Sequence, residues 1–107
     1  MYARIVKLTF MNDFSKQAAS SLLVELGKTK GFAAGLLFRL SVDISATQRY
    51  SMTIWPDKTS EKKSWKLFGK EVLKKLRETG ARIEISRGSI NEMQISKDLD
   101  FRKFYVN

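Results

Sequence analysis

The chain has 107 residues, a formal net charge of +9, no cysteine and no histidine. Its length suits one domain, residues 1–107, with a single modest core. The missing residue types exclude disulfides, thiolate chemistry, most zinc sites and imidazole catalysis, so we expect no metal and no cofactor. The sequence has no charged-then-apolar leader and no apolar run of membrane-spanning length. We therefore expect a cytoplasmic protein that begins at Met1 and has no membrane partner.

The first quarter of the chain predicts a strand followed by a helix. Residues 2–10 alternate in the way of a strand, and residues 16–28 carry apolar side chains at helical spacing. We expect Asp13 or Ser15 to cap this helix, because short polar side chains bind the free N–H groups of a first turn. Gly31 is expected to end the helix in a left-handed conformation.

Two further strands are predicted over residues 32–44 and 48–55. The start of the first is apolar on both sides, from Ala33 to Phe38, which predicts that both of its faces are covered. The connection between the two strands is short, so they should form an antiparallel hairpin. Pro56 cannot donate a ladder hydrogen bond and should end the second of them.

A basic helix is predicted over residues 59–79, with Gly80 as its stop. Asp57, Thr59 or Ser60 could cap it, and the pattern does not choose among them. A fourth strand should follow over residues 81–87. Residues 89–107 are less regular but too apolar for a free tail, so we expect a C-terminal arm that docks on its own domain or on a partner. Its apolar residues are Ile90, Met93, Ile95, Leu99, Phe101, Phe104 and Tyr105.

The order β-α-β-β-α-β predicts an α+β, ferredoxin-like sandwich, in which a four-stranded antiparallel sheet carries two helices on one face. Alternation then assigns each strand residue to the helix-covered or the open face. The helix-covered face is expected to hold Val6, Leu8, Leu36, Phe38, Leu40, Met52, Ile54, Ile83 and Ile85. The open face is expected to hold Ala3, Ile5, Lys7, Thr9, Leu37, Arg39, Ser41, Arg49, Ser51, Thr53, Trp55, Arg82, Glu84 and Ser86.

The expected open face is too apolar for a solvated surface, and a second copy of the chain would cover it. The strand that ends in Thr53-Ile54-Trp55, followed by a polar turn and a helix start at Ser60-Glu61, resembles the dimeric α/β-barrel superfamily. Within it, the chain is most similar to antibiotic-biosynthesis-monooxygenase-like domains. The resemblance implies a homodimer that holds a hydrophobic ligand between sheet and helices. It carries over Trp55, with Asn12 as a second position.

We therefore expect a homodimeric barrel that binds a hydrophobic small molecule, such as a fatty-acid-like or polyketide-like acid. The cavity walls and basic contacts are expected to be Trp55, Phe38, Tyr50, Met52, Trp65, Phe68, Arg39 and Arg49. One of the two arginines could hold a carboxylate. Simple core packing explains the aromatic residues equally well, and alternation places Trp55 on the open face, away from such a cavity.

Other functions remain open at this point. A cofactor-independent monooxygenase acting on an aromatic substrate follows from the resemblance alone, so the sequence does not decide whether the chain is an enzyme. RNA-recognition motifs share the topology, but they stack bases on aromatic side chains at the sheet centre, where we expect Ile5 or Lys7 and Ser51 or Thr53. Nucleic acid is thus an unlikely partner despite the basic charge. A regulatory amino-acid-binding module is a third option, although no catalytic domain accompanies it.

Overall fold

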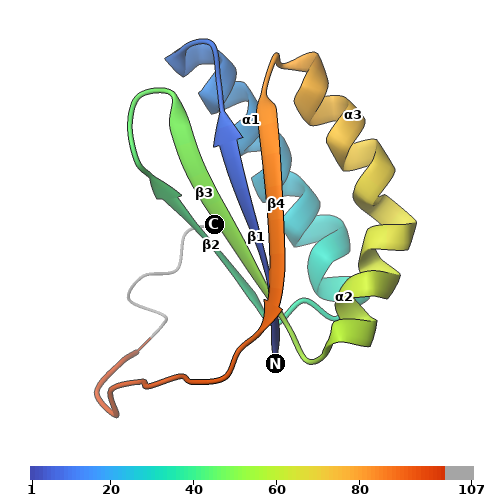
Figure 1. The fold of residues 1–107 in the computed structure, drawn as a ribbon, viewed down its shortest axis with the longest axis vertical. Helices are drawn as coiled ribbons and strands as arrows, with labels where there is room; N and C mark the ends of the chain where they lie inside the picture. The colour runs from blue at the N-terminus through green and yellow to red at the C-terminus, as the bar shows by residue number, and fades with distance from the viewer. Residues whose placement is uncertain (101–107) are drawn as a thin grey trace.

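The computed structural model describes residues 1–100, and the remaining apolar residues of the predicted arm, Phe101, Phe104 and Tyr105, lie outside the described part. The strands and helices follow the predicted order (Figure 1). They are β1 (Tyr2–Thr9), α1 (Asp13–Leu26), β2 (Phe38–Asp43), β3 (Gln48–Trp55), α2 (Lys58–Ser64), α3 (Lys70–Glu78) and β4 (Arg82–Ser89).

Both predicted helices contain a π-helical segment. The segment Trp65–Gly69 joins α2 to α3, so these two are parts of one long helix. The segment Gly27–Gly31 extends α1 and leads into a 3₁₀ turn at Phe32–Ala34. π-Helical turns are rare and occur often at functional sites.

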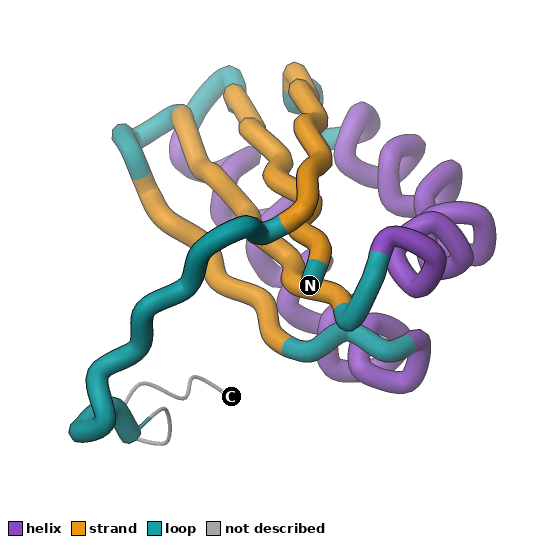
Figure 2. The backbone as a smooth tube through the Cα atoms, turned by 60° about the horizontal axis from the view of Figure 1, so that its bottom comes forward, coloured by secondary structure: helices purple, strands orange, loops and turns teal. Residues whose placement is uncertain are grey.

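The four strands form one antiparallel sheet in the order β2-β3-β1-β4. The helices lie together on one side of this sheet, and the other side carries no helix (Figure 2). The predicted ferredoxin-like architecture is therefore confirmed. Among residues 1–100, no helix is long and apolar enough to cross a membrane.

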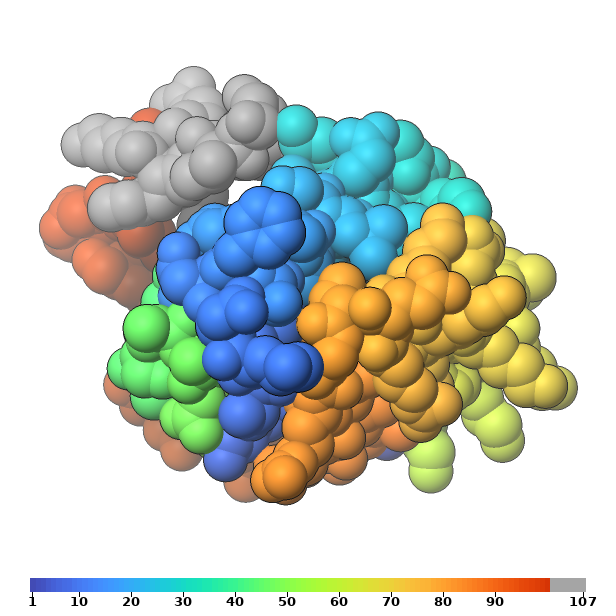
Figure 3. Space-filling model, turned by 90° about the horizontal axis from the view of Figure 1, so that it is seen from above, coloured from blue at the N-terminus to red at the C-terminus, as the bar shows by residue number. Residues whose placement is uncertain are grey.

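The core lies between β1 and the helices. Leu8, Phe10, Ala19 and Leu76 are buried together, and Val6, Leu23, Val72, Ala81 and Ile83 pack against them. Figure 3 views the end of the molecule where the turn after β1 lies between the β2–β3 hairpin and the start of β4. This end of the core is covered by chain that connects the elements.

The expected faces of β2 and β3 are wrong. Leu8 packs on the helices and stands directly opposite Arg49, and residues directly opposite in an antiparallel pair share a face. The helix-covered face therefore carries Arg49, Ser51, Thr53 and Trp55 from β3 and Arg39 and Ser41 from β2. The open face carries Phe38, Leu40, Met52 and Ile54, all four predicted to lie under the helices, together with Tyr50.

The faces were assigned wrongly because polar side chains were expected to lie away from the helices. The polar side chains under the helices are paired in several places, as when Arg49 Nε donates to Asp43 Oδ1 at 2.7 Å, so burial does not exclude them. The alternating apolar side chains of β2 and β3 instead lie on the open face. The expectations for β1 and β4 are correct, because Val6, Leu8, Ile83 and Ile85 do lie on the helix-covered side.

Several local expectations also change. Asn12 caps α1, because its side-chain oxygen accepts from Ser15 N at 2.8 Å, and neither predicted cap is used. Gly31 is right-handed, and the left-handed glycine is Gly35 at φ 101°. Residues 32–37 therefore remain outside β2, and the two-sided apolar start of the predicted strand is a helical turn and a connection.

The second helix behaves more nearly as predicted. Asp57 is its cap, since Oδ1 accepts from Ser60 N at 2.7 Å. Gly80 follows the helix with φ 81°, which confirms its role as a left-handed stop. After β4, the arm leaves the sheet near the N-terminus and runs away from the helices (Figure 1). Met93, Ile95 and Leu99 are exposed along it.

We predict that Asn12→Ala lowers the free energy of unfolding by about 1 kcal/mol, because it removes the side-chain acceptor of the first turn of α1. Asn12→Ser should retain most of this stability, because serine caps equally well. Urea unfolding followed by circular dichroism measures both variants. Equal stability of the alanine and serine variants would contradict the assigned cap.

Candidate functional site

A row of charged side chains crosses the helix-covered face of the sheet. The strand register places Arg39 opposite Thr53, Thr53 opposite Arg4, and Arg4 opposite Arg87. We call these four residues the arginine row. It places three guanidinium groups on adjacent or next-adjacent strands, although like charges directly opposite each other destabilise a sheet.

Glu61 of α2 compensates two of these charges. Its Oε1 accepts from Arg4 Nε at 2.9 Å and from Arg87 Nε at 2.7 Å, and its side chain is 3% exposed. Burial alone would raise the pKa of Glu61, but the hydrogen bonds and charges of Arg87 and Arg4 outweigh burial and hold the pKa below its usual value. Glu61 is therefore an ionised carboxylate that links α2 to β1 and β4.

The two tryptophans enclose the guanidinium of Arg4. Arg4 Cζ lies 5.3 Å from the ring centroid of Trp55 and 4.8 Å from that of Trp65. Arg87 Cζ lies 4.7 Å from the ring centroid of Trp65. Trp55 Nε1 also donates to Thr53 Oγ1 at 3.0 Å, so Trp55 orients a second member of the arginine row.

The arrangement leaves polar groups unsatisfied. Nη2 of Arg4 is buried and has no hydrogen-bond partner among residues 1–100. Burial is the main reason that the pKa of Arg4 lies below its usual value, although the hydrogen bond to Glu61 opposes this. Burial likewise lowers the pKa of Arg39, and the positive charge of Arg49 lowers it further.

A second charged group lies at the far end of β3. Arg49 is bound to Asp43, and Lys16 Nζ lies 3.7 Å from Asp43 Oδ2. Lys16 also donates to the backbone oxygen of Ser45 at 3.2 Å. These contacts tie α1 to the β2–β3 hairpin, so Arg49 already has a partner and is less suited to hold a ligand than Arg39.

A cavity of ≈ 70 Å³, here called the inner cavity, lies between the sheet and the helices. Arg4, Arg39, Ser51, Thr53 and Trp65 give it a polar and aromatic side. The apolar side is formed by Val6, Leu8, Leu23, Val72, Leu73, Leu76, Ile83 and Ile85. Small-molecule sites usually combine apolar walls with a few convergent polar groups in this way, although their volumes are larger, at about 300–1,000 Å³.

The structure separates the eight site residues proposed from the sequence. Arg39 and Trp65 line the inner cavity, whereas Trp55 packs against Arg4 of the arginine row. Phe68 lies under Lys30, whose Nζ is 5.5 Å from its ring centroid. Arg49 is paired with Asp43 and does not line the inner cavity. The last three, Phe38, Tyr50 and Met52, lie on the open face. The conflict over Trp55 disappears, because it faces the helices.

Sequence reasoning missed Arg4, Arg87 and Glu61, which form the charged centre of the site. A signal existed: Arg4 interrupts an otherwise apolar stretch of β1 on the same side as Val6 and Leu8. A charge at such a position requires a partner under the helices, and Glu61 is the one acidic residue in the first turn of α2.

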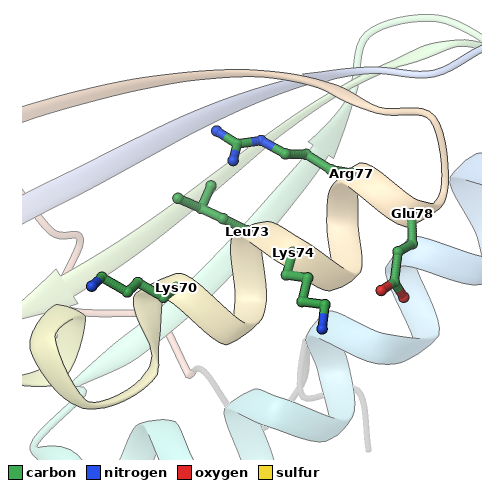
Figure 4. A pocket seen from close by; sticks show the side chains of 5 residues that line it. All are labelled: Lys70, Leu73, Lys74, Arg77 and Glu78. Carbon is green, nitrogen blue, oxygen red and sulfur yellow. The ribbon is translucent and has the colours of Figure 1, made fainter.

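A larger hollow lies on the outside of α3, with a volume of ≈ 530 Å³. Lys70, Leu73, Lys74, Arg77 and Glu78 line it, and all five belong to one helix (Figure 4). No second element provides a wall, so this hollow does not enclose a ligand. Its basic side chains belong to the exposed face of the helix and contribute to the field that attracts anions.

The corrected faces also alter the comparison with RNA-recognition motifs. The central open-face positions are Ile5 or Lys7 on β1 and Tyr50 or Met52 on β3. An aromatic residue, Tyr50, therefore stands where the sequence analysis expected Ser51 or Thr53. That nucleic acid is an unlikely partner remains a prediction.

No protein-family model matches the sequence, and comparison with curated proteins finds no match. Solved structures do share the fold. A dimeric ferredoxin-like protein from an uncultured marine organism is 16% identical, with a TM-score of 0.68, over 90% of this chain and 100% of that one. A proposed antibiotic biosynthesis monooxygenase from Deinococcus radiodurans is 13% identical, with a TM-score of 0.69, over 90% of this chain and 98% of that one.

A third similar structure is SnoaB, a cofactor-independent oxygenase from Streptomyces nogalater. It is 8% identical, with a TM-score of 0.68, over 86% of this chain and 94% of that one. The resemblance stated from the sequence is thus confirmed at the level of the fold. The chain has the fold of dimeric ferredoxin-like and monooxygenase-like proteins.

We predict that Glu61→Gln lowers the free energy of unfolding by about 3 kcal/mol, because it leaves two guanidinium groups without their carboxylate. The control is Glu71→Gln, which removes an exposed carboxylate paired with Lys75 and Lys30 and should cost far less stability, because exposed ion pairs contribute little. Urea unfolding at pH 7 compares the two. Equal losses would show that Glu61 does not stabilise the site.

A comparison of Glu61→Gln with the wild-type chain also tests the pKa of Glu61. Because this pKa is lowered in the folded protein, ionised Glu61 adds stability above its unfolded pKa of about 4.3. That stability should disappear as the pH falls through the lower folded pKa. Glu61→Gln should therefore lose less stability on acidification than the wild-type chain does, and a parallel loss in both would contradict the assignment.

Proposed function

We propose that the chain forms a homodimer through the open face of its sheet and that each subunit binds a hydrophobic small molecule in the inner cavity. The observation that carries the proposal is the cavity itself, which combines an apolar wall with a polar row between sheet and helices. A fatty-acid-like or polyketide-like acid suits both sides of the cavity.

The open face supports the dimer. It carries Phe38, Leu40, Val42, Tyr50, Met52 and Ile54 next to Ala3 and Ile5. Leu40 is 42% exposed and Val42 46% exposed in the single chain. Contiguous apolar surface of this kind marks an interaction site on a monomer. The similar structure from the marine organism is described as dimeric, which favours a second copy as the partner.

The size of the inner cavity limits what can enter the closed form. At ≈ 70 Å³ it is well below the range of about 300–1,000 Å³ of ordinary small-molecule sites, so the closed form suits only a compact molecule. A longer ligand requires α1 and the second helix to move outward. The π-helical segments support such movement, because each interrupts one of these helices and Trp65 of the cavity wall begins one of them.

A single measurement tests both parts of the proposal. Native mass spectrometry of the purified chain should give a dimer mass with an added small-molecule mass, and denaturing spectra should give the bare chain. A monomer at micromolar concentration would contradict the dimer. A dimer without any added mass, and with no mass gained on incubation with decanoate, would contradict the ligand site.

The open face can be tested separately with Leu40→Lys. This variant places a charge in the proposed interface, so sedimentation velocity should show a shift from dimer to monomer at the same concentration. Leu67→Lys is the matched control, since Leu67 is exposed on the helical side of the molecule. Equal association states in both variants would place the dimer contact elsewhere.

A second candidate function is a cofactor-independent oxygenase, which the similarity to SnoaB favours. The guanidinium of Arg4 supports it, because its Nη2 has no hydrogen-bond partner among residues 1–100 and would stabilise the phenolate form of an aromatic substrate. With anthrone, one O₂ is consumed, and anthraquinone and water form. An oxygen electrode should record uptake above the spontaneous rate, and Trp55→Phe should abolish the excess. No excess with the wild-type chain excludes this reaction.

A further inference from the structure

We propose that Arg39 and Nη2 of Arg4 form an anion site inside the inner cavity, and that the natural ligand is a small apolar acid held there by its carboxylate. This inference rests on the proposed function, because it assigns a charge and an orientation to the molecule bound in that cavity.

The arginine row contains three guanidinium groups and Glu61 approaches two of them. Glu61 binds Arg4 and Arg87 through one oxygen atom, Oε1. Arg39 has no carboxylate within 4.0 Å among residues 1–100. It also lies near a further cation, Arg49. A half-buried cation in this position requires a counter-ion, and the cavity beside it is where one fits.

Arg4 supplies a second group that requires an acceptor. Its side chain is 12% exposed, and its Nε is used by Glu61. The stacked rings of Trp55 and Trp65 provide no lone pairs to the remaining N–H groups in the guanidinium plane. Within residues 1–100, Nη2 is left buried without a partner, and a buried donor of this kind costs about 1–3 kcal/mol unless something accepts from it.

The spacing of the two arginines suits one carboxylate. Arg39 lies on β2 and Arg4 on β1, and Thr53 lies between them on β3. The Cα atoms of the two arginines are therefore two strand spacings, or about 10 Å, apart. Both side chains reach the same cavity. Arginine binds carboxylates through a planar fork, and a carboxylate has two oxygens with about four acceptor sites, enough for both groups at once.

Thr53 completes the polar side. Its Oγ1 accepts the indole proton of Trp55, which leaves the hydroxyl proton of Thr53 to be donated. Thr53 also lines the inner cavity. Every polar group at this position is therefore a donor or can act as one, which selects an acceptor-only group such as a carboxylate over an amide or an alcohol.

The apolar side of the inner cavity determines the chemistry of the ligand beyond its carboxylate. Leu23, Val72 and Leu73 reach the cavity from the helices, and Val6, Ile83 and Ile85 reach it from the sheet. Beyond the arginine row, only Ser51 and Trp65 bring polar atoms to this lining, one hydroxyl and one indole N–H. The class that fits is a carboxylate on a compact aliphatic or aromatic group, rather than a sugar acid or an amino acid.

Benzoate and benzamide test the charge of the ligand, because they have nearly the same shape. We expect benzoate to bind at least about tenfold more tightly than benzamide at pH 7, since a hydrogen bond to a charged group is stronger than one to a neutral group. Titration followed by ¹⁵N NMR should shift the side-chain Nε–H signals of Arg39 and Arg4. Equal affinity of both compounds, or shifts confined to other residues, would overturn the anion site.

Arg39→Gln tests the residue. It should reduce benzoate affinity by about tenfold or more and leave benzamide affinity unchanged. The control is Arg77→Gln, which removes the same charge from the outside of α3 and should leave both affinities unchanged. A role in folding predicts a lower thermal midpoint for Arg39→Gln without ligand, whereas removal of an uncompensated cation predicts a midpoint at or above that of the wild type. A lower midpoint would overturn the assignment.

The outcomes separate this inference from the proposed function. If benzoate and benzamide bind the inner cavity equally, the hydrophobic ligand site is supported and the anion site is contradicted. If neither compound binds, and native mass spectra show no added mass, both the hydrophobic ligand site and the anion site are contradicted. If benzoate binds selectively and Arg39→Gln abolishes the selectivity, the anion site is established.

Discussion

The structure depends on how one carboxylate, Glu61, neutralises guanidinium groups beneath the helices. Arg4 and Arg87 stand directly opposite each other on neighbouring strands, an arrangement that repels. Glu61 accepts from both, and Trp55 and Trp65 cover the Arg4 guanidinium. A buried charge is tolerated only when it is paired and hydrogen-bonded. The position of α2 against the sheet is therefore fixed by charge as well as by apolar packing.

The charged row belongs to a sheet of unusual polarity. In a two-layer sandwich the face under the helices is normally the apolar one. Here β2 and β3 direct Arg39, Ser51 and Thr53 toward the helices and direct Leu40, Tyr50 and Met52 away from them. The core is consequently concentrated around β1, where Leu8 is fully buried. The side without helices exposes Leu40, Val42 and Tyr50 in the single chain, which is the physical reason to expect a second copy there.

The order and type of the elements followed from the sequence because they depend on local signals. The boundaries of β3 were predicted correctly, since Pro56 ends the strand and a short turn begins it. Alternation in β3 is equally clear, but alternation does not say which side the helices cover. That choice depends on pairing with β1, where Leu8 stands opposite Arg49, and on Glu61. Arg39 was proposed from the sequence, but Arg4 was missed, because only the strand pairing places Arg4 beside Thr53 and Thr53 beside Arg39.

The helices that cover the arginine row are joined at the level of their π-helical segments. Lys30 Nζ lies 3.7 Å from Glu71 Oε2 and over the ring of Phe68, so one side chain of the first segment contacts the second helix twice. In the other segment, a Cβ on Gly69 would lie 2.5 Å from Trp65 Cδ2, so glycine allows the indole to lie flat against its own helix.

The Lys30–Glu71 contact is a partly exposed ion pair, which is weak, whereas the contacts of Glu61 are buried and strong. Any outward movement of the helices is therefore expected to begin at the Lys30 side, with the Glu61 end as the fixed point. Such a hinge would enlarge the inner cavity and leave the contacts between Glu61 and Arg4 in place.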